Sequence, residues 1–299
     1  MKKKSPGSSS LMLAALLIWL ALIAALLCLS GCGAAPEGGG AGSSGAEADF
    51  LAGLAESIEP EMALEENGAR YLGELSALAL ERPELAERLK FIAEHIDIYS
   101  EAAVKTALQS EEKLDFALLL PFRTPDASGL GERVELTGGV PYMRQYDSRW
   151  GYHAYGSGAL GITGCGPTCL AMAAAYLKGD AALNPALMAD FAERHGFYVP
   201  GEGTRWSLFT TGAAELGLVG EELPLDEGVM RSSLDAGAAL VLSMLPGDFT
   251  DSGHFIVIDG YSEEGFSVLD PNSPERSAVP WSFEALRGQT ANLWSLSAD

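Results

Sequence analysis

Two cysteines four residues apart are the strongest chemical feature of the sequence. They lie in the segment Gly164-Cys-Gly-Pro-Thr-Cys-Leu-Ala-Met, which continues as an alanine-rich apolar run typical of a buried helix. Because Pro167 suits the first turn of a helix, Cys165 is predicted at the helix N-terminus. Unpaired N–H groups and the helix dipole favour a thiolate there, and the thiolate is the nucleophilic form. Cys165 is therefore a candidate nucleophile.

A cysteine nucleophile needs a base, and the candidate is His254. This residue opens the apolar run His-Phe-Ile-Val-Ile, and Asp270 follows the next strand-like run, Phe266–Leu269. The two runs predict an antiparallel hairpin, in which the start of one strand lies beside the end of the next. We therefore expect His254 to act as general base and acid, with Asp270 orienting it.

The remaining catalytic function is stabilisation of an oxyanion, and Gln145 upstream of the cysteine is the candidate donor. Asp259 and Asn272 are alternative orienters of the histidine, although Asp259 lies near the expected hairpin turn. Aromatic residues and a glycine-rich loop are expected to wall the substrate cleft: Trp206, Tyr155 and residues 156–164.

The cysteines also permit other interpretations. Cys169 would lie on the same helix face as Cys165 and is expected in the core, since a disulfide within one helix would be strained. A metal site could recruit His153 or His195, but the other two cysteines, Cys28 and Cys32, lie in the N-terminal leader and at its end, so the body of the protein has no second cysteine pair. The sequence thus predicts neither a metal nor a cofactor.

A glycine pattern, Gly156-Ser-Gly-Ala-Leu-Gly161, formally matches the dinucleotide-binding fingerprint. That fingerprint requires a buried strand directly before it and a helix directly after it. The preceding residues are polar and aromatic, so a loop over the cleft is the better interpretation.

The N-terminus has the layout of a secretory signal. Three lysines precede an apolar run over residues 11–29, and Leu29-Ser30-Gly31-Cys32 resembles a bacterial lipobox. This predicts a signal peptide over residues 1–31 and a lipid on Cys32 that anchors the protein to the membrane. Alternatives are a retained membrane-spanning helix and ordinary cleavage.

The charge balance limits the partners. The 299 residues carry 19 Lys and Arg against 41 Asp and Glu, a net charge of −22. Nucleic-acid binding requires a basic surface, so this class of partner is excluded. Anionic headgroups would also repel the acidic body, which suits a lipid tether that holds it outside the cytoplasm.

Composition divides the rest of the chain. Residues 32–48 are a Gly/Ala/Ser tether, and residues 49–120 show helical spacing of apolar residues. Residues 121–135 form a Pro- and Gly-containing linker, and helices precede strands in residues 136–299, which indicates an α+β domain. The helical region could cap the cleft, bind a partner or act as a spacer.

The second region resembles the papain-like cysteine peptidases that process bacteriocins at double-glycine leaders, especially stand-alone secreted domains. The similar stretches are 140–150, 164–172, 203–206, 246–255 and 270–277. The resemblance implies a papain-like fold with Cys165 as nucleophile, His254 as base, Asp270 as orienting acid and Gln145 in the oxyanion hole. Cys169 departs from the pattern, where Ser or Ala is usual.

These observations predict a lipid-anchored extracytoplasmic cysteine peptidase that cleaves peptide bonds through a thioester on Cys165. One alternative is a peptidoglycan amidase or endopeptidase of papain-like architecture. The other is a non-catalytic peptide-binding module on a peptidase scaffold, which the complete set of four residues argues against.

Overall fold

The computed structural model describes residues 49, 51–55, 67–123 and 129–299. The predicted signal peptide, the lipidation residue Cys32 and the tether lie outside the described residues. Within the described ranges, no helix combines the length and the hydropathy that crossing a bilayer requires.

The helical region consists of short helices around a core of its own. Its elements are α3 (Gly68–Glu81), η2 (Pro83–Leu85), α4 (Ala86–Glu94), η3 (Ile96–Ile98), α5 (Glu101–Ala107), α6 (Glu111–Leu119) and η4 (Leu120–Phe122). Ser100 and Ser110 cap α5 and α6, since each hydroxyl accepts a hydrogen bond from the first turn of its helix. Apolar residues at helical spacing, among them Leu75, Leu89 and Ile92, fill the core.

The second region opens with short elements around one long helix. Its first half contains β1 (Ala154–Tyr155), β2 (Gly158–Ala159), α7 (Leu160–Thr163), α8 (Cys165–Lys178), α9 (Pro185–Arg194), β3 (Tyr198–Val199), β4 (Gly203–Thr204), η5 (Trp206–Phe209) and α10 (Thr211–Glu215). Its second half contains β5 (Leu218–Glu222), α11 (Glu227–Asp235), β6 (Ala239–Met244), β7 (His254–Tyr261), β8 (Phe266–Leu269), α12 (Pro274–Ser277), α13 (Phe283–Arg287) and β9 (Thr290–Ala298).

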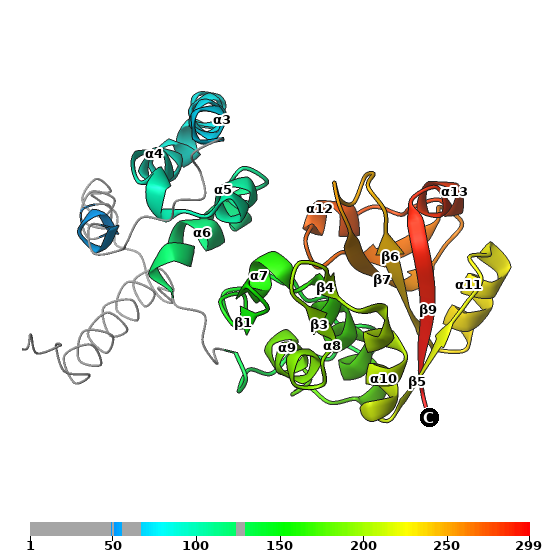
Figure 1. Cartoon of the computed structure of the whole chain (residues 1–299). Coiled ribbons are helices and arrows are strands. Elements are labelled where there is room, and N and C mark those ends of the chain that lie inside the picture. The colour runs from blue at the N-terminus through cyan, green and yellow to red at the C-terminus, as the bar shows by residue number, and fades with distance from the viewer. Residues whose placement is uncertain (1–48, 50, 56–66, 124–128) are drawn as a thin grey trace, which may run out of the picture. The chain divides into compact units, whose positions relative to one another are not determined.

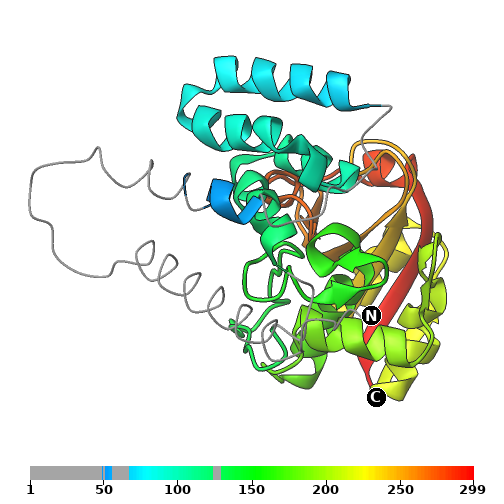
Figure 2. The same cartoon turned by 60° about the vertical axis from the view of Figure 1, so that its left-hand side comes forward.

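A five-stranded antiparallel sheet organises this region, in the order β5-β9-β6-β7-β8. The strand β9 runs the length of the sheet and ends at the C-terminus (Figures 1 and 2). Alternate residues of the central strand β6 enter two different cores: Val241 packs on the α8 side, whereas Leu240 and Leu242 pack on the side of α11. Both faces are therefore covered, and every residue of β6 is buried.

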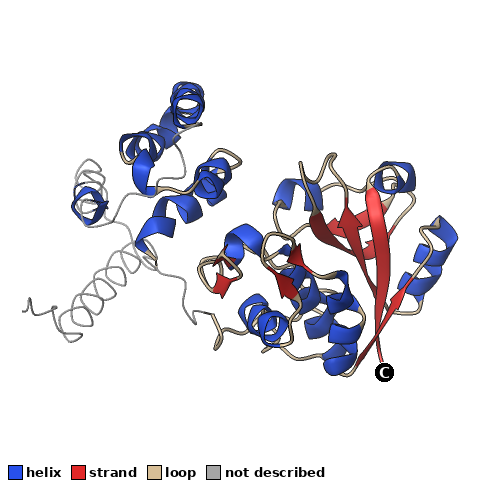
Figure 3. Cartoon of the chain, in the orientation of Figure 1, coloured by secondary structure: helices blue, strands red, loops and turns tan. Residues whose placement is uncertain are grey.

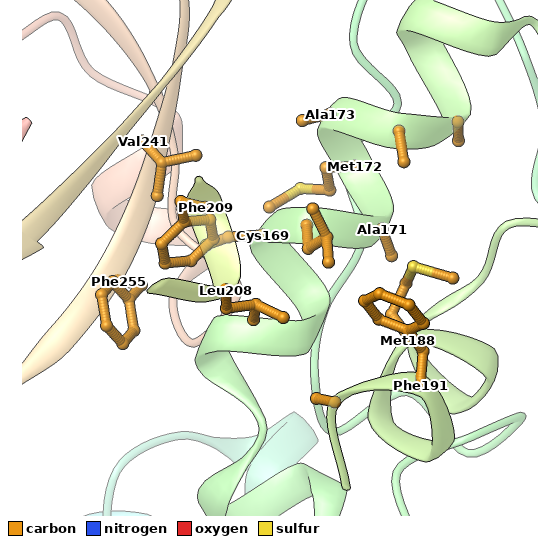
Figure 4. Packing of buried hydrophobic residues seen from close by; sticks show 14 of the residues in the cluster. Cys169, Ala171, Met172, Ala173, Met188, Phe191, Leu208, Phe209, Val241 and Phe255 are labelled. Atoms are coloured by element: carbon orange, nitrogen blue, oxygen red, sulfur yellow. The ribbon is translucent and has the colours of Figure 1, made fainter. Parts of the chain in front are cut away.

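Helix α8 is the buried centre of the layer on one face of the sheet. Its residues from Gly166 to Ala175 are all buried, and the run of alanines lets neighbouring elements approach closely. Figure 4 shows Cys169 and Met172 of α8 among Phe209, Val241 and Phe255. This packing fixes the N-terminus of α8 against β7, where the two catalytic candidates lie.

The helical region also contacts the sheet-containing region through α6. Phe116 packs with Tyr146, Tyr152 and Ala159, and the Tyr152 hydroxyl donates a hydrogen bond of 3.2 Å to the Phe116 carbonyl. Arg144 forms an ion pair with Glu112 beside this cluster.

The structure confirms the predicted α+β class: helices and an antiparallel sheet form separate layers (Figure 3). The predicted hairpin is present as β7 and β8, but β7 extends through Tyr261 and leaves only residues 262–265 as the loop. The glycine pattern at 156–161 lies in the β1–β2 hairpin and the start of α7, without the preceding buried strand that dinucleotide binding needs.

Candidate active site

Cys165 is the first residue of α8, with Gly164 as the N-cap. The side chain is partly buried and lines a cleft, so it combines shielding from water with access to a ligand. The position is the helix N-terminus predicted from Pro167, where peptide dipoles favour the thiolate.

His254 is the first residue of β7 and pairs with Met244 of β6 in the sheet. Its imidazole is buried, and Nε2 lies 2.7 Å from Oδ1 of Asp270. Because Nε2 is engaged by the carboxylate, Nδ1 is the nitrogen that remains for the thiol. The hairpin thus brings the predicted base and its predicted orienter into contact.

Asp270 is completely buried, and each carboxylate oxygen has a partner. Oδ1 also accepts the Asn272 backbone N–H at 2.7 Å, and Oδ2 accepts Nε of Arg276 at 2.6 Å. The alternative orienters do not take this position: Asn272 contributes a backbone amide to Asp270, and Asp259 receives its side-chain hydrogen bond from Ser267. Asp270 is therefore held with one oxygen towards the histidine.

Electrostatics in the site favour a thiolate beside an imidazolium. Burial alone would lower the pKa of His254, but the Asp270 charge and hydrogen bond dominate and raise it to about 9. Burial likewise opposes ionisation of Cys165, yet His254 and the backbone amides of Phe255 and Gly166 hold the thiol pKa below its ordinary value. Asp270 itself stays ionised, because His254 and Arg276 outweigh its burial and lower its pKa.

Gln145 lies in the same cleft, on the segment before β1. Its backbone N–H donates to the Pro271 carbonyl at 2.8 Å, and its side-chain Nε2 donates to the Gly161 carbonyl at 3.0 Å. One amide hydrogen of Nε2 is thereby fixed, which orients the second. The Oε1 atom is buried and has no hydrogen-bond partner among the described residues.

The cleft has a volume of about 1220 Å³ and is lined by Cys165, His254 and Gln145 together with Trp206, which is 48% exposed. The glycine-rich loop contributes Ser157 and residues 161–163 to its wall, as expected. Tyr155, in contrast, does not line the cleft, so its prediction as a wall residue is wrong. Its ring is fully buried, and its hydroxyl hydrogen-bonds Thr204, which lines the cleft in its place.

The second cysteine has no part in this arrangement. Cys169 is a free thiol in the core, and burial raises its pKa well above the usual range. The histidines considered for a metal site lie in other pairs: His153 contacts Asp190 at 2.8 Å, and His195 contacts Glu215. Among the described residues, no three potential metal-binding side chains are grouped.

Two residues of the cleft are not among those predicted from the sequence. Arg276 binds Asp270 from α12, and Lys113 of α6 lines the cleft from the helical region. Arg276 lies only six residues after the predicted orienter, which is a weak signal that sequence could have offered. Lys113 offers none, because its place in the cleft depends on how the helical region packs.

Comparisons with known proteins find similar solved structures and one protein family. The peptidase domain of Streptococcus ComA, "a Bi-functional ABC Transporter Involved in Quorum Sensing Pathway", is 18% identical, with a TM-score of 0.36 over 46% of this chain and 93% of that one. A putative C39-like peptidase from Bacillus anthracis is 19% identical, with a TM-score of 0.38 over 56% of this chain and 98% of that one. No curated protein gives a significant match. The model of the Peptidase_C39 like family matches residues 137–297, more than half of the sequence, and the chain therefore belongs to this family.

Proposed function

We propose that the protein is a lipid-anchored extracytoplasmic cysteine peptidase. The observation that carries this proposal is the buried His254–Asp270 pair beside a cleft-lining cysteine whose thiol pKa is lowered. Membership of the C39-like peptidase family supports the same reaction class. The mutual effect of Cys165 and His254 on each other's pKa also disfavours a non-catalytic binding module.

The first half of the reaction is acyl transfer to sulfur. The Cys165 thiolate attacks the substrate carbonyl carbon and forms a C–S bond, and the carbonyl oxygen becomes an oxyanion. The second N–H of Gln145 Nε2 donates to this oxygen. The C–N bond then breaks, and His254 transfers its proton to the departing amine, leaving a thioester and a neutral imidazole.

The second half is hydrolysis of the thioester. Neutral His254 removes a proton from a water molecule, whose oxygen attacks the thioester carbonyl. The C–S bond breaks, a carboxylic acid leaves, and the thiolate and imidazolium are restored. Asp270 remains ionised throughout and stabilises the imidazolium form of His254 each time it forms.

The activity test compares hydrolysis of a peptide library by wild type and Cys165→Ala, with Cys169→Ala as the matched control. We expect cleavage by wild type and Cys169→Ala and none by Cys165→Ala. Cleavage that survives Cys165→Ala would contradict the proposal. A parallel digestion of purified muropeptides separates a general peptidase from a cell-wall endopeptidase or amidase. A cell-wall enzyme would cleave the muropeptides but not the peptide library.

The proposed anchor depends on Cys32 and the lipobox before it. A diacylglycerol chain with a second acyl chain would give stable attachment to a bilayer. Wild type expressed in a bacterium is expected to partition into detergent and to carry lipid on Cys32, whereas Cys32→Ala is expected to lose the lipid. An unlipidated wild-type protein would contradict this part of the proposal.

A further inference from the structure

Lys113 is an unusual cation within the cleft. Its side chain is only 4% exposed, although lysines are almost never buried without a charged partner. The ammonium hydrogen-bonds the Gln109 side chain and lies 5.5 Å from the centre of the Tyr146 ring. Among the residues that the structure describes, no carboxylate forms an ion pair with it.

Such an arrangement carries an electrostatic cost. Burial favours the neutral amine and, with repulsion from Arg276, lowers the pKa of Lys113 to about 8, against the opposing effects of Asp270 and Glu275. A neutral amide and an aromatic face compensate a buried ammonium only partly. An anion that entered the cleft would complete its coordination.

The position of Lys113 relates it to the chemistry. Lys113 lines the same cleft as His254 and Arg276, and its charge interacts with Arg276 and with Asp270, which holds His254. His254 must protonate the departing amine, so the departing part of a substrate passes beside His254. An anionic substrate group there would lie in the same cleft as Lys113 and would interact with its charge, as Asp270 does.

The charged groups that act on Lys113 each have another partner. Arg276 gives its Nε to Asp270, which also holds His254, and Glu275 accepts a hydrogen bond from the Ser273 hydroxyl at 2.8 Å. Lys105, the other lysine on the cleft, is paired with Glu101 at 2.8 Å. Arg276 and Lys105 are each paired with a carboxylate, whereas Lys113 has no ion-pair partner among the described residues.

We propose that Lys113, assisted by Arg276, binds a carboxylate on the part of the substrate that lies over His254. The helical region then contributes directly to specificity and selects peptides with an acidic side chain or a terminal carboxylate near the cleaved bond. This inference rests on the proposed peptidase function and names its substrate class.

The test compares two alkylating reagents of similar size, anionic iodoacetate and neutral iodoacetamide, by their rates of modification of Cys165. Their rate ratio reports the electrostatic attraction of a carboxylate into the cleft, and each protein serves as its own reference. The variants are Lys113→Gln and Lys113→Met, which remove the charge, and Lys113→Arg, which keeps it. The matched control is Lys90→Gln, which removes one charge from an exposed lysine paired with Glu94.

In wild type we expect an iodoacetate-to-iodoacetamide ratio above that of a free cysteine, despite the net charge of −22. Both neutral variants should lower the ratio roughly three- to fivefold, as expected for loss of one nearby charge in a solvated cleft. Lys113→Arg and Lys90→Gln should leave it unchanged.

Two results would overturn the inference: an equal decrease in Lys90→Gln, or an unchanged ratio in a neutral variant that iodoacetamide still modifies at Cys165. If one neutral variant does not fold, the other provides the measurement, and a wild-type ratio below that of free cysteine counts against the inference without any variant. Failure of iodoacetamide to modify wild-type Cys165 would instead contradict the proposed function.

Discussion

At the scale of single residues, the site depends on one fully buried carboxylate that is shared between two cations. Asp270 holds the His254 ring through Oδ1 and Arg276 through Oδ2. The first contact could be predicted from sequence, because a hairpin places the start of β7 beside the end of β8. For the contact with Arg276, proximity in sequence is only a weak signal, because the contact depends on how α12 folds back over the end of that strand.

The Asp270 charge sets the pH range of activity. Since this charge raises the pKa of His254 to about 9, the imidazolium persists at neutral pH and is lost as the pH rises through that value. Asp270→Asn should therefore move the alkaline limb of kcat/KM to lower pH. The acidic limb should move to higher pH, because a less stable imidazolium raises the Cys165 pKa, and the rate at the optimum should fall by about 10²-fold or more.

A pH–rate profile of wild type, Asp270→Asn and Asn272→Ala checks this expectation. Asn272→Ala keeps the backbone amide that donates to Asp270, so its limbs should match wild type. A wild-type profile in the Asp270→Asn variant would show that the carboxylate does not orient the base.

At the scale of elements, the predictable parts are those whose sequence pattern and environment agree. The apolar run that opens β7 and the alanine-rich α8 are buried, and each was expected in its place. The strand β5 was not, because Leu-Val-Gly-Glu-Glu is short and ends in two acids. It becomes a strand by pairing at the sheet edge with β9, a tertiary contact that local preference does not encode.

Gly166 shows how closely the elements of the cleft approach one another. An added Cβ would lie 2.7 Å from both Oγ1 and Cγ2 of Thr204, whose hydroxyl is bonded to Tyr155. Gly166→Ala should therefore cost roughly 1–3 kcal/mol in the free energy of unfolding and reduce activity, since α8 and β4 must separate.

Denaturant unfolding of a double-mutant cycle measures this effect. The cost of Gly166→Ala should shrink in a Thr204→Gly background, because the clashing atoms are gone. Gly158→Ala is the control: no atom lies within 4 Å of its added Cβ, so a change within about 0.5 kcal/mol is expected. Equal costs of Gly166→Ala in both backgrounds would refute the steric explanation.

At the scale of the whole molecule, the helical region forms part of the cleft wall. Sequence left its function open between a cap, a partner-binding module and a spacer. The structure places Lys113 and neighbouring residues of α5 and α6 on the cleft, and Phe116 in a cluster with Tyr146 and Tyr152. Apolar packing, rather than charge, should hold this region, because the Arg144–Glu112 ion pair is largely exposed to solvent.

Two substitutions on α6 compare these contributions. Phe116→Ala leaves a cavity between the regions and should reduce the free energy of unfolding by about 3 kcal/mol or more. Glu112→Gln removes the charge of the ion pair but keeps an amide oxygen that can accept from the Tyr146 hydroxyl, so it should cost less than about 1 kcal/mol. Denaturant unfolding of the full chain gives both values. A larger cost for Glu112→Gln than for Phe116→Ala would show that charge, rather than apolar packing, holds the helical region.

The most direct test of the central claim measures how fast iodoacetamide modifies Cys165 and Cys169 in the full chain, resolved by mass spectrometry. At about pH 6, well below the ordinary pKa of a thiol, Cys165 should react while buried Cys169 does not. His254→Ala should slow the Cys165 reaction at least about tenfold, because the thiolate loses its imidazolium partner. Peptide hydrolysis by wild type should fall in proportion to the fraction of Cys165 modified. Hydrolysis that persists with Cys165 fully alkylated, or equal rates at the two cysteines, would contradict the assignment of Cys165 as the nucleophile.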